Sequence, residues 1–144
     1  MATFNLPATQ DALEAHFKSS FIQPFHETAI PTPETVKRNA AGRIDPYITF
    51  QYGDVTDGYS ETFGGAETGD FFLPVYFQVV SPEASISRKL YNKLLETMLG
   101  FKTPHGGQVR KGVGGASLPM ANDDGTILAY VNPSSFKVKV QLFS

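Results

Sequence analysis

Two stretches of the chain repeat apolar residues with the spacing of an α-helix. In Gln10–Phe21 a leucine and two phenylalanines recur at every fourth position, Thr9 is a suitable N-cap and Pro24 lies beyond the end. In Ser85–Leu99 a broader apolar stripe lies opposite a basic side, and Gly100 is placed to cap the C-terminus. The pattern predicts two amphipathic helices, and the second is expected to pack on the core.

Strand patterns lie between and after these helices. Pro46–Tyr52 and Phe71–Val80 are rich in aromatic and β-branched residues, and Pro74 should place its missing N–H at an edge or a bulge. Ser135–Phe143 alternates apolar and polar positions, which is typical of a strand with one buried and one wet face. Weaker strand patterns cover Phe25–Ala29, Thr126–Val131 and Gln108–Lys111, and the last of these suits either a strand or a loop.

Turn-forming residues separate these elements. Asn122–Gly125 is typical of a hairpin turn, and Asn132–Ser134 predicts a second turn between the last two strand patterns. Glu34–Arg43, which follows two prolines and lacks an apolar period, is expected to be a surface excursion. Two glycine-rich segments are predicted to be long loops: Gly53–Gly69, which is acidic, and Gly106–Ser117, which is basic.

The order of the elements and the composition indicate one α+β domain. A chain of 144 residues, of which 41% are hydrophobic, is long enough to bury one core. Its 13 glycines and 10 prolines favour strands and long loops over a helical bundle. We therefore expect a mostly antiparallel sheet of four to six strands, with two helices packed on one face and long Gly-rich loop arms.

Charge and cysteine content narrow the classes of function. The 12 Lys and Arg residues against 14 Asp and Glu residues give a net charge of −2, which argues against an autonomous nucleic-acid-binding domain. The lack of cysteine excludes disulfides, thiolate zinc sites, cysteine nucleophiles and iron–sulfur clusters. No apolar run is long enough to cross a bilayer and the first residues do not form a signal peptide, so a soluble cytoplasmic protein is expected.

Motifs for catalysis and for ligand binding fail at the residues that carry the chemistry. The three histidines, His16, His26 and His105, have no partner at a metal-binding spacing. The Asn122–Gly125 turn lacks the closing glutamate of a calcium loop, and the glycines from residue 107 to 114 lack the lysine and hydroxyl of a phosphate loop. Ser117 lacks the second glycine of a nucleophile elbow. We therefore expect no catalytic residue, no metal and no cofactor.

The two glycine-rich segments are the unusual feature of the sequence. One interpretation makes them solvated connectors. The other makes them contact arms, because glycine lets a backbone approach a partner closely. In the acidic arm Tyr59 and Phe63 would supply anchoring area beside Glu61. Arg110 and Lys111 of the other arm would meet such an arm head-to-tail between identical subunits, and contacts of this kind close into rings.

The order of the elements resembles that of the tail terminator proteins of long-tailed, siphovirus-like bacteriophages. The likeness covers nearly the whole chain and rests on an overall pattern, without one invariant motif. Its parts are the helix Gln10–Phe21, the strand Pro24–Thr28 with the prolines after it, the strand Tyr47–Tyr52, the glycine-rich arm, the strand Phe71–Val80, the helix Ser85–Leu99 and the terminal strand.

The resemblance implies a structural role in the virion tail, after assembly in the host cytoplasm. Proteins of this family form a hexameric ring that caps the tail tube, ends its elongation and provides a surface for head-tail joining. The implied partners are other copies of the chain, the tail tube protein and a head-completion or connector protein. DNA would pass through the ring without specific binding, and Asp54, Asp57 and Glu67, with Glu61, would suit an acidic lumen.

Two other readings stay open. The chain has the size and the arms of a head-completion or tail tube protein of the same virion. A small enzyme or ligand-binding domain is the alternative from a different class, with a pocket formed by the two glycine-rich segments. Its candidate polar groups are Arg43, His105, Arg110 and Asp124.

Overall fold

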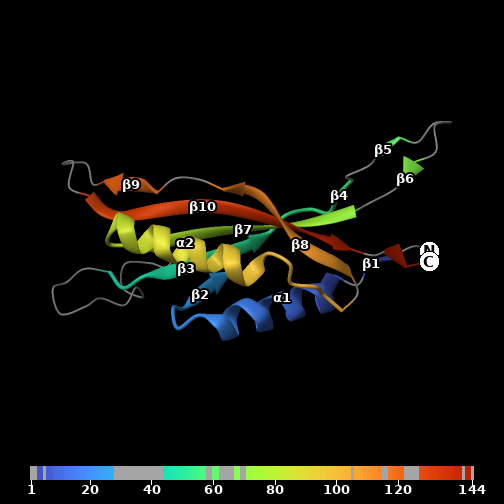
Figure 1. The fold of residues 1–144 in the computed structure, drawn as a ribbon, viewed down its shortest axis with the longest axis horizontal. Coiled ribbons are helices and arrows are strands. Elements are labelled where there is room, and N and C mark those ends of the chain that lie inside the picture. The colour runs from blue at the N-terminus through green and yellow to red at the C-terminus, as the bar shows by residue number, and fades with distance from the viewer. Residues whose placement is uncertain are drawn as a thin grey trace.

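In the computed structural model of the chain, one large sheet carries two helices on one side within the residues that are described (Figure 1). These residues are 3–4, 6–27, 44–57, 60–61, 67–68, 71–104, 106–114, 117–121, 127–140 and 142–143. The expected α+β class is confirmed. The excursion predicted at 34–43 and the turn predicted at 122–125 lie outside the described residues.

The first helix, α1 (Leu6–Ser20), begins four residues earlier than the pattern predicted. Thr9, expected as the N-cap, is buried within the helix, so that prediction was wrong. Thr9 lies one turn before Leu13 and Phe17 and extends the buried stripe of the helix. Pro7 falls in the first turn, where the backbone N–H has no helical partner, so this proline does not prevent the earlier start.

The second helix, α2 (Ala84–Met98), follows the prediction to within one residue at each end. Glu83 is the N-cap in an extended conformation, and its carbonyl oxygen accepts a hydrogen bond of 2.7 Å from the Ser81 hydroxyl. Leu99 is the C-cap, and Gly100 follows with φ of +82°. Glycine adopts this left-handed conformation without strain, so Gly100 ends the helix one position beyond the cap residue.

Five strands of the described chain lie side by side in the large sheet. Their order is β2 (Phe25–Glu27), β3 (Tyr47–Tyr52), β7 (Phe71–Ser81), β10 (Ile127–Val140) and β8 (Gly106–Gly114). Neighbouring strands are antiparallel except β2 and β3, which run parallel. The sheet is therefore mostly antiparallel, as expected, and its two longest strands pair with each other.

Short strands complete the described part of the fold. Residues Thr56–Asp57 form β4, which pairs with β7, and Leu118–Ala121 form β9, which pairs with β10, so seven strands of the described chain belong to this sheet. Two further antiparallel pairs are β1 (Thr3–Phe4) with β11 (Leu142–Phe143) and β5 (Ser60–Glu61) with β6 (Glu67–Thr68). Parts of the acidic segment predicted as a loop are therefore strand.

Two connections predicted from turn-forming residues are strands instead. Most of the predicted Gly106–Ser117 loop is strand β8, and β10 runs through Asn132–Ser134 without the predicted turn. On one side of β10 the neighbouring strand changes at this point, because β9 pairs up to Val131 and β8 begins opposite Ser134. Pro133 therefore lies where one ladder is interrupted, and such a position tolerates the missing N–H of proline.

Pro74 lies at a similar interruption beside β7. Strand β3 pairs with β7 up to Val75, and β4 resumes the pairing at Phe72. Between them Gly53 donates its N–H to the Pro74 carbonyl oxygen at 2.9 Å. A Cβ at Gly53 would lie 2.7 Å from Pro74 Cγ and 2.9 Å from Tyr76 Cε2. The crossing from β3 to β4 therefore requires glycine at this position.

An aromatic cluster joins α1 to the sheet. The ring centroid of Phe17 lies 4.7 Å from that of Phe25, 5.0 Å from that of Phe50 and 5.3 Å from that of Phe77. Phe77 in turn contacts Phe136 of β10, with 5.7 Å between centroids. Most of these rings meet edge-on, a favourable arrangement of aromatic quadrupoles. Phe17 is therefore the side chain through which α1 is held on three strands.

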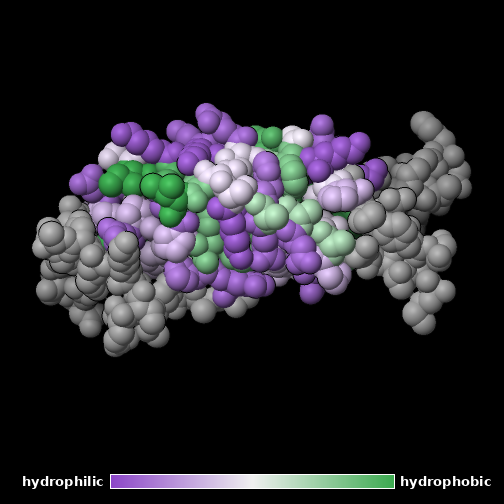
Figure 2. All heavy atoms as spheres, turned by 90° about the horizontal axis from the view of Figure 1, so that it is seen from below, coloured by the Kyte–Doolittle hydropathy of each residue, from purple (hydrophilic) through white to green (hydrophobic). Residues whose placement is uncertain are grey.

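The helical side of the molecule presents a polar surface over this core. Figure 2, viewed from the side on which α1 lies, shows mainly hydrophilic atoms with a compact hydrophobic patch near one end. Long cations cover aromatic rings at the rim: Lys93 Nζ lies 4.7 Å from the centroid of Phe21, and Lys18 Nζ lies 5.3 Å from that of Phe50. Their aliphatic stems shield apolar surface while the charges stay in water.

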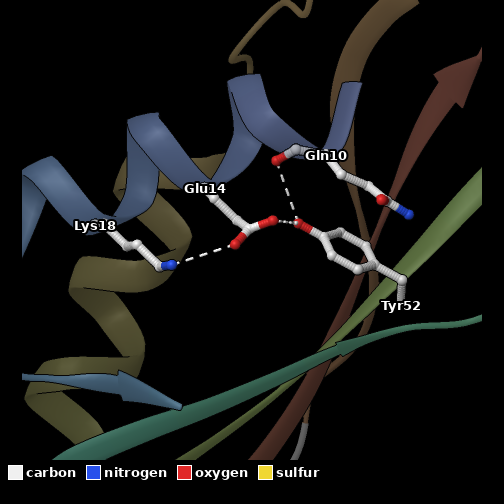
Figure 3. A network of polar contacts seen from close by, with 4 residues as sticks. All are labelled: Gln10, Glu14, Lys18 and Tyr52. Carbon is white, nitrogen blue, oxygen red and sulfur yellow. Dashed lines mark hydrogen bonds and ion pairs between the residues drawn. The ribbon is translucent and has the colours of Figure 1, made fainter. Parts of the chain in front are cut away.

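A polar network ties α1 to β3 (Figure 3). The Tyr52 hydroxyl lies 3.0 Å from Glu14 Oε2 and 3.3 Å from the Gln10 carbonyl oxygen, and Lys18 Nζ donates to Glu14 Oε1 at 3.2 Å. Burial and the adjacent Glu14 carboxylate raise the pKa of Tyr52 above the ordinary value. Both effects disfavour the phenolate, so this contact holds only while Tyr52 is protonated.

We predict that Phe17→Ala lowers the free energy of unfolding by about 3 to 5 kcal/mol, because it opens a cavity at the centre of the aromatic cluster. Denaturant unfolding followed by circular dichroism measures this loss. Ile22→Ala is the matched control: this side chain is 93% exposed, and its truncation should change stability by no more than about 0.5 kcal/mol. Equal losses in the two variants would contradict the assigned core.

We predict that the protein loses stability as the pH rises above about 10, the ordinary pKa of tyrosine. There the unfolded chain releases the Tyr52 proton while the folded chain keeps it, so the free energy of unfolding falls by up to about 1.4 kcal/mol per pH unit. The raised pKa of buried Tyr47 acts in the same direction. Tyr52→Phe should therefore reduce the slope without abolishing it, as denaturant unfolding at a series of alkaline pH values would measure.

Glu14→Gln serves as the comparison, because it keeps the buried hydroxyl and removes the neighbouring charge. The slope of its free energy of unfolding against pH should lie between the slopes of the wild type and of Tyr52→Phe. A wild-type slope in Tyr52→Phe would refute the contribution of this tyrosine.

Candidate assembly surface

The face of the sheet opposite the helices, called here the open face, carries a different set of side chains. Residues alternate along a strand, so the even-numbered residues of β7 face away from the helices. Tyr76 is 43% exposed and Gln78 is exposed. In register beside Tyr76 lie Gln51 of β3 and Ser135 of β10. The middle of the open face is therefore polar and accessible.

One end of the open face is apolar. Its buried residues are Tyr47, Val80 and Ala129, with Ile44 and Val131 packed against them. Next to this cluster, the edge strand β9 pairs Leu118 with Val131 and Met120 with Ala129. Leu118 is 55% exposed and Met120 is 39% exposed. Exposed apolar residues on an edge strand are typical of a surface that associates with another chain.

The other end of the open face is basic. Phe72 of β7 is only 7% exposed, and two cations lie over its ring: Lys137 Nζ at 5.0 Å and Arg110 Cζ at 5.9 Å from the centroid. Lys139 lies opposite Phe72 in the β7–β10 register. Its Cβ would be 3.0 Å from a Cβ placed at Gly107, so the stem of Lys139 lies close against β8. Phe72, Arg110, Lys137 and Lys139 are called the basic strip below.

The two cations predicted to act together in a loop are separated by the strand. Arg110 and Lys111 are consecutive in β8, so their side chains leave opposite faces of the sheet. Arg110 pairs with Lys137 on the open face, whereas Lys111 pairs with Phe136, which belongs to the core side. Both cations are exposed, as expected. Their grouping in one loop, however, was wrong, because β8 is a strand.

The acidic residues predicted for the other segment fall on several short elements. Asp54 is exposed between β3 and β4, and Asp57 lies in β4, opposite Phe71. Glu61 of β5 and Glu67 of β6 face each other in register. Figure 1 places the β5–β6 pair beyond the end of the large sheet. Tyr59 and Phe63, predicted as anchors, lie outside the described residues.

The described histidines take part in packing. His16 Nε2 lies 2.7 Å from the Thr97 carbonyl oxygen, and its ring stacks on Phe101 with 3.8 Å between centroids. This pair of contacts joins α1 to the end of α2. His26 meets Tyr47 edge-on at 5.7 Å. Among the described residues there is no cluster of metal-binding side chains, and no helix there is both long and apolar enough to span a membrane.

The polar groups nominated for a ligand pocket do not form a described site. Arg110 is exposed on β8, with its guanidinium over Phe72. Arg43, His105 and Asp124 lie outside the residues that the structure describes. Of the groups nominated for this pocket, the described residues therefore include only Arg110, which lies with Lys137 of β10 over the Phe72 ring.

Sequence reasoning did not select Phe72, Lys137 or Lys139 as site residues. The alternation in the last strand already placed the two lysines on a wet face. The residues that they contact could not be predicted from sequence, because the pairing of β7, β8 and β10 joins positions far apart in the chain. The cation that completes the strip, Arg110, could be chosen from sequence, but its neighbour across the ladder could not.

We predict that Phe72 and Lys137 are energetically coupled. A double-mutant cycle with Phe72→Ala and Lys137→Ala, measured by denaturant unfolding, should give a coupling of about 0.5 to 1 kcal/mol. The same cycle with Lys111→Ala should give a coupling near zero, because Lys111 leaves the opposite face of the sheet. Equal coupling in the two cycles would contradict the basic strip.

Comparison with known proteins adds a likeness of fold. No protein-family model matches the chain, and no curated protein matches it. Among solved structures, a chain of the "Virion of native gene transfer agent (GTA) particle" matches with a TM-score of 0.52 and 10% identity. The match covers 92% of this chain and 97% of that chain. At this identity the likeness shows a shared fold, and it extends over nearly the full length of both chains.

Proposed function

We propose that this chain is a structural subunit of a phage-like virion and, more specifically, a tail terminator. The observation that carries the proposal is the fold shared, along nearly its whole length, with a chain of a gene transfer agent virion particle. The order of helices and strands, which resembles that of tail terminators, supports the same role. In this proposal six copies form a ring that caps the tail tube, ends its elongation and offers its other face for head-tail joining.

The open face supports a role in assembly. A ring subunit needs exposed surfaces that pair with neighbours, and such surfaces combine apolar anchors with charged rims. The edge strand β9 exposes Leu118 and Met120, and the basic strip lies at the other end of the same face. His16 is engaged between the two helices. We propose a role of shape and contact, without a catalytic residue or a cofactor.

DNA would pass through the ring without specific binding. Asp54, Asp57 and Glu67 are the proposed lining of the lumen, because negative charge keeps a polyanion from adhering to the wall. Their segment connects two strands of the large sheet and contains the β5–β6 pair. The proposed location of the protein is the virion tail, with assembly in the host cytoplasm.

A tail tube protein or a head-completion protein of the same virion is the second candidate, because virion proteins of this size share an α+β fold and projecting arms. Assembly behaviour separates these candidates. A tube protein polymerises into long cylinders at high concentration, whereas a terminator stops at one ring or at two rings back to back.

We predict that the purified protein forms closed six-membered rings, which native mass measurement and negative-stain imaging would detect. Addition of the rings to growing tail tubes should stop elongation, and the mean tube length should fall as more rings are added. Long cylinders of the protein itself would contradict the terminator role and favour the tube protein. A monomer at all concentrations, with a thermal shift on adding a nucleotide or a sugar, would favour the ligand-binding alternative.

We predict weak binding of duplex DNA, with a dissociation constant above about 10 µM at physiological salt, because the chain is acidic overall. Fluorescence anisotropy with a labelled duplex at two salt concentrations measures this. A tight complex that weakens steeply with salt would overturn the passive lumen.

A further inference from the structure

We propose that the basic strip is the docking site for the acidic segment, residues 53–69, of a second copy of the chain. The inference rests on the proposed ring and specifies the contact that would close it. It replaces the lumen lining proposed above for Asp54, Asp57 and Glu67, because carboxylates that dock on the cations of a neighbour do not face the channel. The strip and the acidic segment are formed by different residues of one subunit, and β4 of the segment pairs with β7 beside Phe72. Docking of one on the other is therefore head-to-tail, and such contacts form a closed ring when the rotation between copies closes.

The charges of the two surfaces are complementary. Residues 53–69 contain four acidic residues and no Lys or Arg: Asp54, Asp57, Glu61 and Glu67. Strand β8 and the part of β10 that pairs with it carry four basic residues and no Asp or Glu: Arg110, Lys111, Lys137 and Lys139. Three of these four belong to the basic strip. Opposite potentials of this kind select a partner and fix its register.

The strip is arranged before any partner arrives. Phe72 is nearly buried, and the charged groups of Arg110 and Lys137 lie over its ring. The aromatic face holds both cations on the open face, so less side-chain freedom is lost when a carboxylate binds. Arginine is also enriched among the residues that carry most of the binding energy in protein interfaces. Arg110 is able to bind a carboxylate through two parallel N–H groups.

The described strands of the acidic segment lie beside β7 or beyond the end of the large sheet. Its first strand, β4, pairs with β7 at Phe71 and Phe72, on the side of β7 opposite to β10. Its β5–β6 pair then lies beyond the end of the large sheet (Figure 1). In that pair Glu61 is in register with Glu67.

Duplex DNA is the other anion that a row of cations attracts. The strip offers few cations, and the same chain carries an acidic segment whose β5–β6 pair lies beyond the end of the large sheet, so a second copy is the favoured occupant. Binding of DNA to the strip is kept as an outcome of the test.

Disulfide cross-linking provides the test, because the chain contains no cysteine and each introduced thiol reports one position. Glu61→Cys and Lys137→Cys variants, distinguished by a size tag, are mixed under assembly conditions and oxidised. The expected product on a non-reducing gel is the mixed dimer of the two variants. Lys89→Cys, at an exposed position of α2 on the helical side, is the matched control and should give little mixed dimer with Glu61→Cys.

Several outcomes would overturn the inference. One is a homodimer of Glu61→Cys in place of the mixed dimer, which is expected if Glu61 of two copies meets at a twofold axis. Another is cross-linking of Glu61→Cys to Lys89→Cys that equals its cross-linking to Lys137→Cys. A cross-link within a Glu61→Cys, Lys137→Cys double variant that stays monomeric would place the segment on its own strip. Salt-sensitive binding of duplex DNA that Lys137→Glu abolishes would make the strip a DNA contact.

Charge reversal gives an independent measurement on folded variants. Arg110→Glu with Lys137→Glu should lower the assembled fraction about tenfold, as sedimentation measures, because several attractive pairs become repulsive. Adding Glu61→Lys and Glu67→Lys to the same chain should restore assembly. Failure of this rescue, with circular dichroism unchanged, would contradict the contact.

The inference and the proposed function fail in different ways. If wild-type rings form and stop tube elongation but the mixed dimer is missing, the docking contact is wrong and the terminator role stands. If the mixed dimer forms but the assemblies grow into cylinders, the contact stands and the terminator role is wrong. If the wild type does not self-associate at any concentration tested, docking between copies is overturned, and the elongation assay judges the virion role separately.

Discussion

The pairing of β7 with β10 is the constraint from which the rest of the structure follows. In its register Phe136 lies beside Val75 and Val138 beside Leu73, which places one apolar face of both strands under the helices. Side chains alternate with a period of two, so a shift by one residue would turn this face to solvent. The same register brings Lys137 and Lys139 to the opposite face. The register of β7 with β10 therefore determines both which residues form the core and which residues lie on the open face.

Much of the fold could be predicted from local periodicity. The apolar stripe of α2 and the runs that became β3 and β7 were visible in the sequence because burial of one face imposes a repeat. The predictions failed where contacts with residues far away in the sequence determine the local structure. Thr9 suits an N-cap by its chemistry, but the helix continues because that side of the first turn is buried. Asn132–Ser134 suits a turn, but pairing with β7 keeps these residues extended.

The candidate surface was less accessible to sequence reasoning than the core. Arg110 was selected for its charge, yet its partners Phe72 and Lys137 come from strands that lie far from it in the chain. No local signal says which residue faces which across a ladder. Lys111, chosen with Arg110 because the two are adjacent, leaves the sheet on the other side, since adjacency along a strand separates side chains. Pairing registers are the missing information in both cases.

The two prolines inside long strands have a consequence for misfolding. Pro74 lies opposite the gap between β3 and β4, and Pro133 lies where β9 gives way to β8. A slipped alignment would move either ring against an unbroken neighbour and leave a carbonyl there without its donor. Each proline therefore disfavours pairings of its strand in any register other than the native one. Wrong alignments are penalised at one defined position, and the correct alignment incurs no such cost.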